Sequence, residues 1–556
     1  MSSMDVNLAD LISAVADAVP DRCALVCEGD RLSYRQLMDR ASRLAQHLLA
    51  SGLTPDETVG LYMPNSAAYV ESLLGCMLAR VIPVNVNYRY TGNELAHLFT
   101  NGKLSGLVVD AEYAPLAAAV AEGSQNLRHV LVTGDSGTLP AGFPAGVTAL
   151  DYDTVIAALP GVLPDNGRSG DDKIIIFTGG TTGLPKGVLW RHEDFYFSAL
   201  FGANLAGPPH LSISEVVAAA RQAPPVGSVI TAPLMHGAGT FGVLINLLHG
   251  FRVILGRKFD PAQILRLVSA EQAVALTVVG DGMARPIADE LGAHPGEYDL
   301  SSLLFLNSTG ALLSRPVREQ FLRLCPSLLI ADLFGSSETG GNGQLGQDDD
   351  GRPRLVPRGD VMVLDEALRP VEPGGIGRIA TAGHVPLGYY GDDAATKATF
   401  PVIDGVRWAL LGDAAQLDDD GSVVVLGRGS MCINTGGEKV YPDEVERALK
   451  AHPAVTDVIV AGVPDERFGE RVAAVVSLRP GAAAEPDALR EHCRDTLAGY
   501  KVPARIEFVT EVARFPSGKA DYRWARAVLR GQDPAPTDSA LPAQSVADNS
   551  SGAGFA

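Results

Sequence analysis

The stretch Phe177-Thr-Gly-Gly-Thr-Thr-Gly-Leu-Pro-Lys186-Gly187 constrains the fold of this chain more than any other part of the sequence. It follows a short apolar run, residues 173–176, which predicts a buried strand. Glycines let backbone N–H groups approach an anion closely, threonine hydroxyls add donors, and a lysine supplies positive charge. The sequence therefore predicts a strand that ends in a phosphate-binding loop.

The Walker A pattern does not describe this loop. That pattern requires Ser or Thr directly after its lysine, whereas Lys186 lies between Pro185 and Gly187. The alternative interpretation is a Gly/Thr-rich surface turn, which would explain a single Gly-Gly pair better than it explains this ordered string. The order of the residues favours a phosphate loop of another type.

The composition narrows the class of protein. The chain has 556 residues, of which 46% are hydrophobic and 20% charged, as is typical of a globular enzyme with more than one domain. The formal net charge of −20 argues against nucleic-acid binding, because phosphate backbones require clustered Lys and Arg. An anionic ligand must be bound by local cations, metal ions or backbone N–H groups.

The sequence also predicts a cytoplasmic protein without a membrane span. Its six cysteines lack the spacing of a zinc site, which indicates a reduced intracellular chain. The N-terminus has no basic region ahead of an apolar core, so we expect no secretory signal. The most apolar region, residues 229–255, is interrupted by polar residues and lacks the ~18 consecutive apolar residues of a membrane helix.

Hydrophobic patterning predicts an α/β fold built from two domains. Strand-like runs alternate with helical stretches in the first part of the chain, which indicates βα units and largely parallel sheets. The clearest of these runs are residues 23–27, 58–62, 82–86, 106–110 and 129–133. From residue 361 onward, short strands and glycine turns predict a small β-rich subdomain.

The pattern of predicted helices and strands changes a second time near residue 428. The order helix, strand, strand, helix, strand then predicts a compact α+β unit. These elements are expected at residues 442–450, 455–462, 472–478, 486–497 and 506–509. We therefore expect a large N-terminal domain of two βα-layered sheets plus the β-rich subdomain (1–428), a small mobile C-terminal domain (429–530) and a disordered tail (531–556).

Seven further motifs follow the phosphate loop in a fixed order. They are Ser308-Thr-Gly-Ala-Leu-Leu313, Asp332-Leu-Phe-Gly-Ser-Ser-Glu338-Thr, Gly412-Asp413, Gly427-Arg428, Gly436-Gly-Glu-Lys-Val-Tyr-Pro442, Gly499-Tyr-Lys-Val-Pro503 and Pro516-Ser-Gly-Lys519. Together they resemble the acyl-adenylate-forming superfamily, over nearly the whole chain to about residue 526. The string Trp190-Arg-His-Glu-Asp194 and the run 427–442 are similar to actinobacterial acyl-CoA ligases for fatty acids and steroid side chains.

This resemblance implies an ATP-dependent acyl-CoA ligase for a hydrophobic carboxylic acid. A carboxylate attacks the α-phosphorus of ATP to give acyl-AMP and pyrophosphate, and the thiol of coenzyme A then attacks the acyl carbon. ATP, Mg²⁺ and coenzyme A are the implied cofactor and co-substrates. The sequence leaves open which acid is used, and a homodimer is compatible with it.

The resemblance assigns an ATP site, residue by residue. The implied ATP-binding residues are Thr178, Gly179, Gly180, Thr181, Thr182, Gly183, Lys186, Gly310, Ala311, Leu312, Asp332, Phe334, Gly335, Ser336, Ser337, Asp413 and Arg428. In this assignment Asp332 accepts from the adenine amino group and Asp413 binds the ribose hydroxyls. Phe334 covers the adenine ring, although ordinary core packing would also explain a phenylalanine there.

Three residues are the implied catalytic groups. Lys519 would bridge the attacking carboxylate and ATP, and Glu338 would bind Mg²⁺, because a hard cation prefers oxygen ligands. His236 would lie at the acyl carboxylate, and the implied acyl pocket comprises His236, Gly237, Gly280 and Thr309. The alternatives are a solvated surface lysine, a helix-terminal glutamate and a structural histidine. His192 matches a family position too, and we expect it to support the site rather than react.

The second half-reaction implies a coenzyme A channel and a hinge. The resemblance places Gly436, Gly437 and Glu438 along the channel. Family members carry Asp or Lys at the pivot, where this chain has Met431, and rotation is still expected because a pivot needs torsional freedom more than charge.

A glycine pattern, an aspartate and two alternative functions need a separate interpretation. Residues 341–346 match G-x-G-x-x-G, but an acidic turn follows them, so a dinucleotide fold is not expected. Asp281 is expected to be a helix N-cap rather than a pocket residue. An enzyme that loads an acyl group onto a carrier protein, and an inactive nucleotide-binding regulator, are the competing functions.

Overall fold

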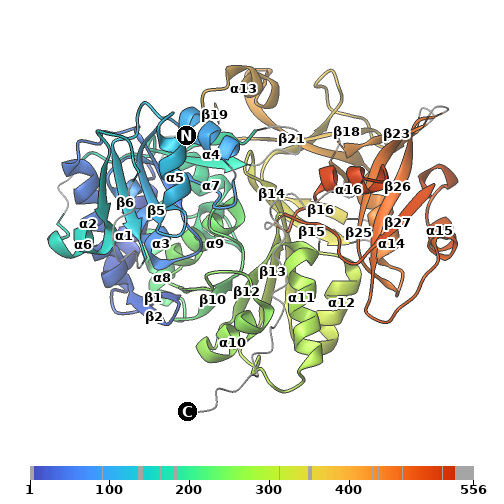
Figure 1. The fold of residues 1–556 in the computed structure, drawn as a ribbon, viewed down its shortest axis with the longest axis horizontal. Helices are drawn as coiled ribbons and strands as arrows, with labels where there is room; N and C mark the ends of the chain where they lie inside the picture. The colour runs from blue at the N-terminus through green and yellow to red at the C-terminus, as the bar shows by residue number, and fades with distance from the viewer. Residues whose placement is uncertain are drawn as a thin grey trace, which may run out of the picture.

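The computed structural model describes residues 5–90, 92–134, 142–162, 166–178, 184–311, 313–347, 353–428, 431–435, 438–465, 468–515 and 518–532. These residues form three sheets with helices packed around them. Figure 1 shows the N-terminal layers on one side, a central sheet, and the C-terminal strands on the other side. The expected α/β architecture, with a large N-terminal and a small C-terminal part, is confirmed.

One sheet of eight strands is mainly parallel and belongs to the N-terminal part. In sheet order its strands are β19 (Gly388–Tyr389), β9 (Lys186–Arg191), β8 (Lys173–Thr178), β4 (Ile82–Asn85), β3 (Thr58–Tyr62), β5 (Leu104–Asp110), β6 (His129–Thr133) and β7 (Thr148–Asp151). The predicted strands 58–62 and 129–133 coincide with β3 and β6. They were predictable because strands buried on both faces read as continuous apolar runs.

The second and larger sheet runs through the centre of the molecule. In order its strands are β17 (Val361–Leu364), β18 (Ile376–Ala382), β21 (Val406–Leu417), β22 (Val423–Arg428), β16 (Pro353–Pro357), β15 (Gly340–Gln347), β14 (Leu329–Ser336), β13 (Phe305–Thr309), β12 (Ala275–Val278), β10 (Gly227–Ile230), β11 (Arg252–Leu255), β1 (Cys23–Cys27) and β2 (Asp30–Ser33), and β20 (Val402–Ile403) pairs with β21. Strands β14, β13, β12, β10, β11 and β1 are parallel, and pairing becomes antiparallel from β15 onward.

The predicted β-rich subdomain is the antiparallel part of this same sheet. Its strands share a core of their own, in which Leu355, Val363 and Ile379 are buried. The segment 341–346 lies within strand β15, in agreement with the expectation that its glycine pattern is not a dinucleotide motif.

Helices cover the faces of these sheets. They are α1 (Leu8–Ala18), α2 (Tyr34–Ala50), α3 (Ala67–Leu78), α4 (Gly92–Asn101), α5 (Ala114–Ala121), α6 (Tyr152–Ala158), α7 (His192–Ser198), α8 (Ile213–Gln222), α9 (Gly237–Leu248), α10 (Pro261–Glu271), α11 (Gly280–Ala293), α12 (Arg315–Leu324) and α13 (Asp393–Thr399). None of the helices that the structure describes is long and apolar enough to cross a membrane.

Local chemistry explains where individual helices begin and lie. Helix α2 begins after Ser33, whose hydroxyl accepts from the backbone N–H of Gln36 (3.2 Å) while the Gln36 side chain accepts from the Ser33 N–H (2.8 Å). This reciprocal capping box satisfies two backbone donors. Helix α3 is apolar around almost its whole circumference and is correspondingly buried along nearly its whole length.

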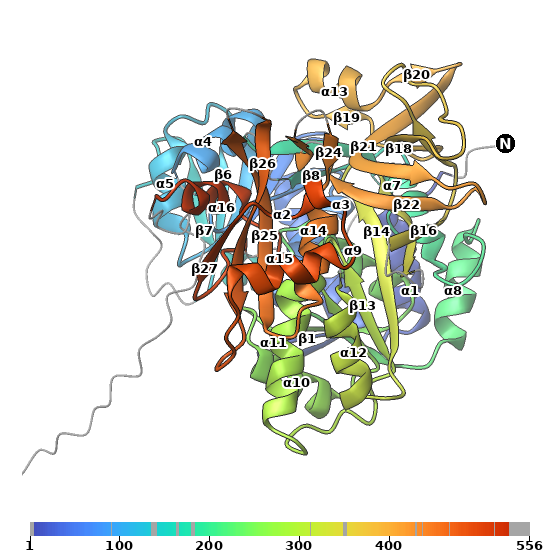
Figure 2. The same ribbon diagram turned by 90° about the vertical axis from the view of Figure 1, so that its right-hand side faces the viewer.

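The C-terminal part has a separate five-stranded sheet and two small cores. Its strands are β24 (Glu438–Val440), β23 (Ile433–Thr435), β26 (Gly469–Leu478), β25 (Val455–Asp465) and β27 (Arg505–Val509), and its helices are α14 (Pro442–Lys450), α15 (Pro486–Arg494) and α16 (Tyr522–Leu529). The helix predicted at 442–450 coincides with α14. In Figure 2 this unit faces the viewer, with α11 of the large domain below it.

Candidate active site

Strands of two sheets end in the region of the candidate site: β8 belongs to the eight-stranded sheet, and β10, β12, β13 and β14 are parallel strands of the large sheet. Strands β8, β10, β12, β13 and β14 lead into the segments that begin at Thr178, Thr231, Val279, Thr309 and Ser336. Ligands of α/β proteins bind in this position because loops, and not strand backbones, face the carboxyl edge of the sheet. The segments that follow β10, β12, β13 and β14 thus lie at one edge of the large sheet although they are far apart in the sequence.

The two ends of the predicted phosphate loop are paired. Thr178 at the end of β8 lies opposite Lys186 at the start of β9 in an antiparallel pair. The loop residues Gly179, Gly180, Thr181, Thr182 and Gly183 lie outside the described residues. Their predicted contact with phosphate stays a prediction.

A chain of polar side chains connects Lys186 to Glu338. The Nζ atom of Lys186 lies 3.4 Å from Oδ2 of Asp392 and 5.3 Å from the centre of the Tyr389 ring. The hydroxyl of Tyr389 donates to Oε1 of Glu338 at 3.0 Å. Burial, together with the Glu338 carboxylate, raises the pKa of Tyr389 above its usual value, so the phenol keeps the proton that it donates.

Sequence reasoning missed Tyr389 and Asp392. Tyr389 lies on the two-residue strand β19, which pairs with β9 and so places the ring beside Lys186. A signal was present, since Gly388-Tyr-Tyr-Gly391 puts two aromatic residues between glycines shortly before an acidic residue. Its relevance depends on a pairing between strands some 200 residues apart, which local patterns do not reveal.

Asp332, the predicted adenine contact, lies in the middle of β14. It is buried and sits opposite Ser308 of β13, and its Oδ2 accepts from the backbone N–H of Leu313 at 3.4 Å. Burial raises the pKa of Asp332 to about 7, although Arg318, whose Nη2 is 3.9 Å away, opposes this shift. The carboxyl therefore titrates near neutral pH.

The backbone around Asp332 is shaped by glycine. Gly310 has a φ of +74°, a left-handed conformation that favours glycine, and it precedes Ala311. At Gly335 an added Cβ would lie 2.0 Å from the carbonyl oxygen of Gly340, so β14 and β15 approach too closely for any side chain. Leu312 lies outside the described residues.

Phe334 and Ser337 have clear packing environments. Phe334 packs against the buried core of the antiparallel strands, which the packing interpretation expects. Trp190 donates its indole N–H to the carbonyl of Ser337 at 2.9 Å. A Cβ added at Gly237 would lie 3.4 Å from Oγ of Ser337, which brings the predicted acyl and phosphate residues into contact range.

Asp413 and Arg428 lie opposite each other on strands β21 and β22. The pairing places the predicted ribose residues side by side, on two neighbouring strands within the antiparallel part of the large sheet. Ser336, beside this region, forms a 3.0 Å hydrogen bond between its hydroxyl and that of Thr339 and accepts from the Glu338 N–H at 3.2 Å. These bonds fix the turn that carries Glu338.

His236 is partly buried at the N-cap of α9. Burial, followed by the positive charges of Lys519 and Arg89, lowers the pKa of His236 to about 3. Its Nε2 is buried without a hydrogen-bond partner among the described residues. The imidazole is therefore neutral at physiological pH and retains one ring nitrogen for a ligand.

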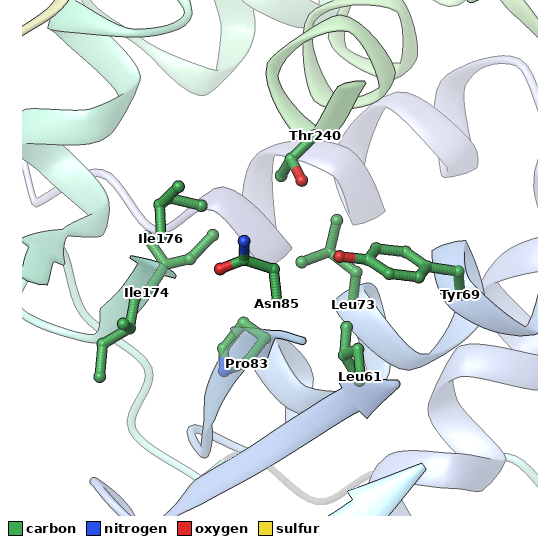
Figure 3. Close-up of a pocket in the computed structure, with 9 residues that line it drawn as sticks. Leu61, Tyr69, Leu73, Pro83, Asn85, Ile174, Ile176 and Thr240 are labelled. Carbon is green, nitrogen blue, oxygen red and sulfur yellow. The ribbon is translucent and has the colours of Figure 1, made fainter. Parts of the chain in front are cut away.

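A small, mostly apolar cavity lies beneath the His236 segment. Figure 3 shows the amide of Asn85 between the isoleucines of β8 and the ring of Tyr69. The polar groups at its wall bind the backbone ahead of His236: Tyr69 and Thr240 donate to the carbonyl of Leu234 at 2.9 and 2.7 Å, and Asn85 donates to the carbonyl of Met235. Their role is to position this segment.

His192 is buried at the start of α7, and burial lowers its pKa to about 3. This neutral imidazole is enclosed by the protein, and its expected supporting role stays a prediction.

Two of the predicted acyl-pocket residues lie at the ends of elements. Gly280 is buried at the start of α11, and Thr309 lies at the end of β13.

Lys519 lies on a tight turn that packs against the start of α11. Gly518 N–H donates to the carbonyl of Phe515 (2.8 Å), and the Phe515 N–H donates to the carbonyl of Lys519 (2.7 Å). Gly518 has a φ of +77°, and a Cβ there would lie 2.9 Å from the Val279 carbonyl oxygen. Because the charge of Lys519 lowers the pKa of His236, its ammonium is within electrostatic range of the acyl-site histidine.

The predicted role of Asp281 as a helix N-cap is wrong. The N-cap of α11 is Val279, and Asp281 lies in the first turn of the helix. Its Oδ1 accepts from the backbone N–H of Ser314 at 2.7 Å, and its Oδ2 lies 3.3 Å from Nζ of Lys450 in the C-terminal unit. The pattern was ambiguous because both partners are remote in the sequence.

The residues predicted for coenzyme A and the hinge are only partly described. Glu438 is exposed on β24, and Met431 is buried, while Gly436 and Gly437 lie outside the described residues. No group of three or more metal-ligating side chains occurs within the described part of the chain. The predicted role of Glu338 as a Mg²⁺ ligand stays a prediction.

With this geometry in place, the chain can be assigned to a family: it belongs to the AMP-binding enzymes. The family model matches residues 12–390, and the model of the AMP-binding enzyme C-terminal domain matches residues 444–519. The resemblance to the acyl-adenylate-forming superfamily is thereby confirmed.

Curated actinobacterial relatives are similar over almost the whole chain. The medium/long-chain-fatty-acid–CoA/3-oxocholest-4-en-26-oate–CoA ligase of Mycobacterium marinum is 42% identical over 531 residues, covering 94% of this chain and 96% of the relative. The 3-oxocholest-4-en-26-oate–CoA ligase of Rhodococcus rhodochrous is 40% identical over 534 residues, with 94% and 96% covered. ATP-bound MatB from Rhodopseudomonas palustris is a structural neighbour with a TM-score of 0.78 at 26% identity, covering 94% and 99%.

Proposed function

We propose that this chain is an ATP-dependent acyl-CoA ligase that activates a hydrophobic carboxylic acid through an acyl-AMP intermediate. One observation carries the proposal. The turn that bears Lys519 packs against the start of α11, and the positive charge of Lys519 contributes to lowering the pKa of His236. This arrangement puts a cation from the C-terminal unit near the start of α11, which directly follows the carboxyl end of β12. Membership in the AMP-binding enzyme family supports the same conclusion.

In the first half-reaction two anions must meet. A carboxylate oxygen of the acid bonds to the α-phosphorus of ATP, the bond to the bridging oxygen breaks, and pyrophosphate leaves with that electron pair. Lys519 offsets the repulsion between carboxylate and triphosphate, which is strong where water is excluded. Lys186 would contribute a second positive charge on the phosphate side, from its place beside Tyr389.

His236 contributes a hydrogen bond and not a charge in this scheme. Its lowered pKa, about 3, keeps the imidazole neutral throughout the physiological range. The unpartnered Nε2 would face the acid, with the ring held in place through the bonds that fix Leu234 and Met235. Lys519 would then supply the positive charge that offsets the repulsion between the carboxylate and ATP.

Glu338 would hold Mg²⁺, which supplies charge neutralisation on the phosphates when bound. Tyr389 donates to one oxygen of this carboxylate and so orients it. The other oxygen would bind the ion. On the base side Asp332 would accept from the adenine amino group, and Asp413 with Arg428 would bind the ribose.

In the second half-reaction the sulfur of coenzyme A bonds to the acyl carbon, the bond to the AMP oxygen breaks, and AMP leaves. We propose that the C-terminal domain (429–530) rotates about the region of Met431 for this step. Gly436, Gly437 and Glu438 would then line the pantetheine channel. Of the segment expected to be a tail (531–556), residues 533–556 lie outside the described residues.

The acid is proposed to be a medium- or long-chain fatty acid or a steroid side-chain acid, as in the names of the relatives from Mycobacterium marinum and Rhodococcus rhodochrous. We also propose a cytoplasmic location, supported by the scattered spacing of the six cysteines in the sequence, which cell fractionation would test. A homodimer stays a prediction, testable by light scattering.

A panel of carboxylic acids tests the function. Decanoate, palmitate, benzoate and 3-oxocholest-4-en-26-oate would each be assayed for AMP release with and without coenzyme A, using Lys519→Ala as a control for background. We expect acyl-CoA and stoichiometric AMP only with coenzyme A, an apolar acid and unmodified protein. Acyl-AMP formation without any thioester would favour a carrier-protein acceptor, and no acid-dependent pyrophosphate release would favour a regulator.

A further inference from the structure

A cluster of charged side chains lies between the two parts of the molecule, outside the predicted ATP and acyl sites. Asp281 of α11 belongs to the large domain, and Lys450 at the end of α14 belongs to the C-terminal domain. Nζ of Lys450 lies 3.3 Å from Oδ2 of Asp281 and 3.3 Å from Oδ1 of Asp457. The Lys450 side chain is 11% exposed and that of Asp281 only 4%, so little water screens the contact.

The cluster extends to the turn that carries Lys519. Arg514 binds Asp457 with two hydrogen bonds, Nε to Oδ2 at 2.5 Å and Nη2 to Oδ1 at 2.7 Å. Its third nitrogen, Nη1, donates to the carbonyl of Gly518 at 3.0 Å. A continuous path therefore leads from Asp281 through Lys450, Asp457 and Arg514 to the residue next to Lys519.

The large-domain end of this path is fixed. Oδ1 of Asp281 accepts from the Ser314 N–H at 2.7 Å, and Nη2 of Arg285 lies 3.7 Å from Oδ2. Within one turn of α11, an added Cβ at Gly282 would lie 3.0 Å from Cα of Gly518. The same helix start thus anchors the lysine turn by close packing and the C-terminal domain by charge.

The neighbouring carboxylates keep the Lys450 ammonium charged although it is buried. Burial alone would lower the pKa of Lys450, but the carboxylates of Asp281 and Asp457 raise it above its usual value, so the ammonium keeps its proton. For Asp457, burial would raise the pKa, but Arg514 and Lys450 lower it. Removing one partner of such a buried pair leaves an uncompensated charge, which costs far more than the pair contributes when intact.

We propose that Asp281 and Lys450 form an interdomain pair that holds the C-terminal domain in the orientation that presents Lys519 for adenylation. This inference rests on the proposed function, and it assigns both residues as positioning residues, since neither lies among the predicted substrate contacts. The pair exists only in this docked arrangement and must separate for the domain to rotate. It therefore biases the enzyme toward the first half-reaction.

The test compares the two half-reactions in three full-length variants. Asp281→Asn keeps an oxygen that can accept from Ser314 but loses the charge, and Lys450→Met leaves Asp457 bound to Arg514. The matched control is Asp289→Asn, on the same helix, because Asp289 is exposed and accepts from Gln320 at 2.7 Å within the large domain. The assays are decanoate-dependent ATP–pyrophosphate exchange and thioester formation from supplied decanoyl-adenylate, with Tm as a measure of folding.

We expect exchange to fall at least about 10-fold in Asp281→Asn and Lys450→Met, while thioester formation from the adenylate stays within about 2-fold. The double variant Asp281→Asn/Lys450→Met should lose less than the product of the two single losses, because both substitutions remove the same interdomain contact. Asp289→Asn should leave both rates unchanged.

Parallel losses in both half-reactions, or unchanged exchange in a folded variant, would overturn the positioning role. Multiplicative losses in the double variant would overturn it as well, since independent residues behave in that way. These outcomes differ from failure of the proposed function, in which the unmodified protein itself would catalyse neither half-reaction with any acid.

Discussion

At the residue scale, burial shifts the pKa values of titratable side chains in the candidate site. Asp332 is the clearest case, because burial raises its pKa from 3.8 to about 7 while Arg318 opposes the shift. A carboxylate accepts a stronger hydrogen bond than a neutral carboxyl group. If Asp332 receives the adenine amino group, binding should strengthen as the pH rises through 7 and the group loses its proton.

Adenosine is the probe for this prediction, because it has no phosphate that titrates near neutrality. We expect its Kd to be about 3- to 10-fold lower at pH 8 than at pH 6. Purine riboside, which lacks the amino group, should show a much smaller change, and Asp332→Asn should flatten the adenosine profile. Equal pH profiles for the two nucleosides, measured by calorimetry, would remove Asp332 from the adenine site.

Tyr389 supplies a second prediction at this scale. Tyr389→Phe removes the 3.0 Å hydrogen bond to Glu338, worth about 1 kcal/mol when one partner is charged and half-buried. We expect KM for ATP to rise about 3- to 10-fold with little change in Tm. Tyr390→Phe is the control, since Tyr390 is adjacent and has no such bond to Glu338. Equal KM values for the two variants would show that the hydroxyl does not orient the carboxylate.

At the element scale, the turn 515–519 depends on glycine for two separable reasons. Gly518 has a left-handed φ of +77° and packs against the Val279 carbonyl, whereas Gly481 in the same domain has a φ of +76° with open space around it. Gly518→Ala and Gly481→Ala should therefore carry a similar backbone strain, about 1–2 kcal/mol in the free energy of unfolding.

Only Gly518→Ala should also displace the lysine turn from α11. We expect ATP–pyrophosphate exchange to fall at least about 10-fold in Gly518→Ala and to stay near normal in Gly481→Ala, because a displacement of about 1 Å at a reacting group can cost two orders of magnitude. Chemical denaturation and exchange assays would be run on both proteins. Similar exchange rates in the two variants would mean that the packing at Val279 does not position Lys519.

The elements themselves were largely predictable from the sequence. Strands β3 and β6 and helix α14 match their predicted ranges, because continuous apolar runs and a proline at the first helical position are local signals. The joining of the β-rich strands to the central sheet was not predicted, since it depends on the pairing of β15 with β16 and of β16 with β22. Tyr389 was missed for the same reason.

At the scale of the whole molecule, the sequence patterns did not predict how the C-terminal unit packs against the large domain. Motifs placed Lys519, Glu338 and His236 in one hypothesis, but they gave no contact between α11 and the C-terminal unit. Asp281 illustrates the limit: an aspartate before a helical stretch predicts a cap, whereas its partner Lys450 lies 169 residues away. Long-range charge pairs of this kind depend on how the domains dock.

The central claim is that the C-terminal domain brings the Lys519 ammonium to the reacting carboxylate and ATP. The most direct measurement compares Lys519→Ala in ATP–pyrophosphate exchange and in thioester formation from supplied acyl-adenylate, with Lys397→Ala as a surface control. The account predicts a loss on the order of 10²–10³-fold in exchange, with thioester formation within about 3-fold of normal. Equal losses in the two reactions, or undiminished exchange, would contradict it.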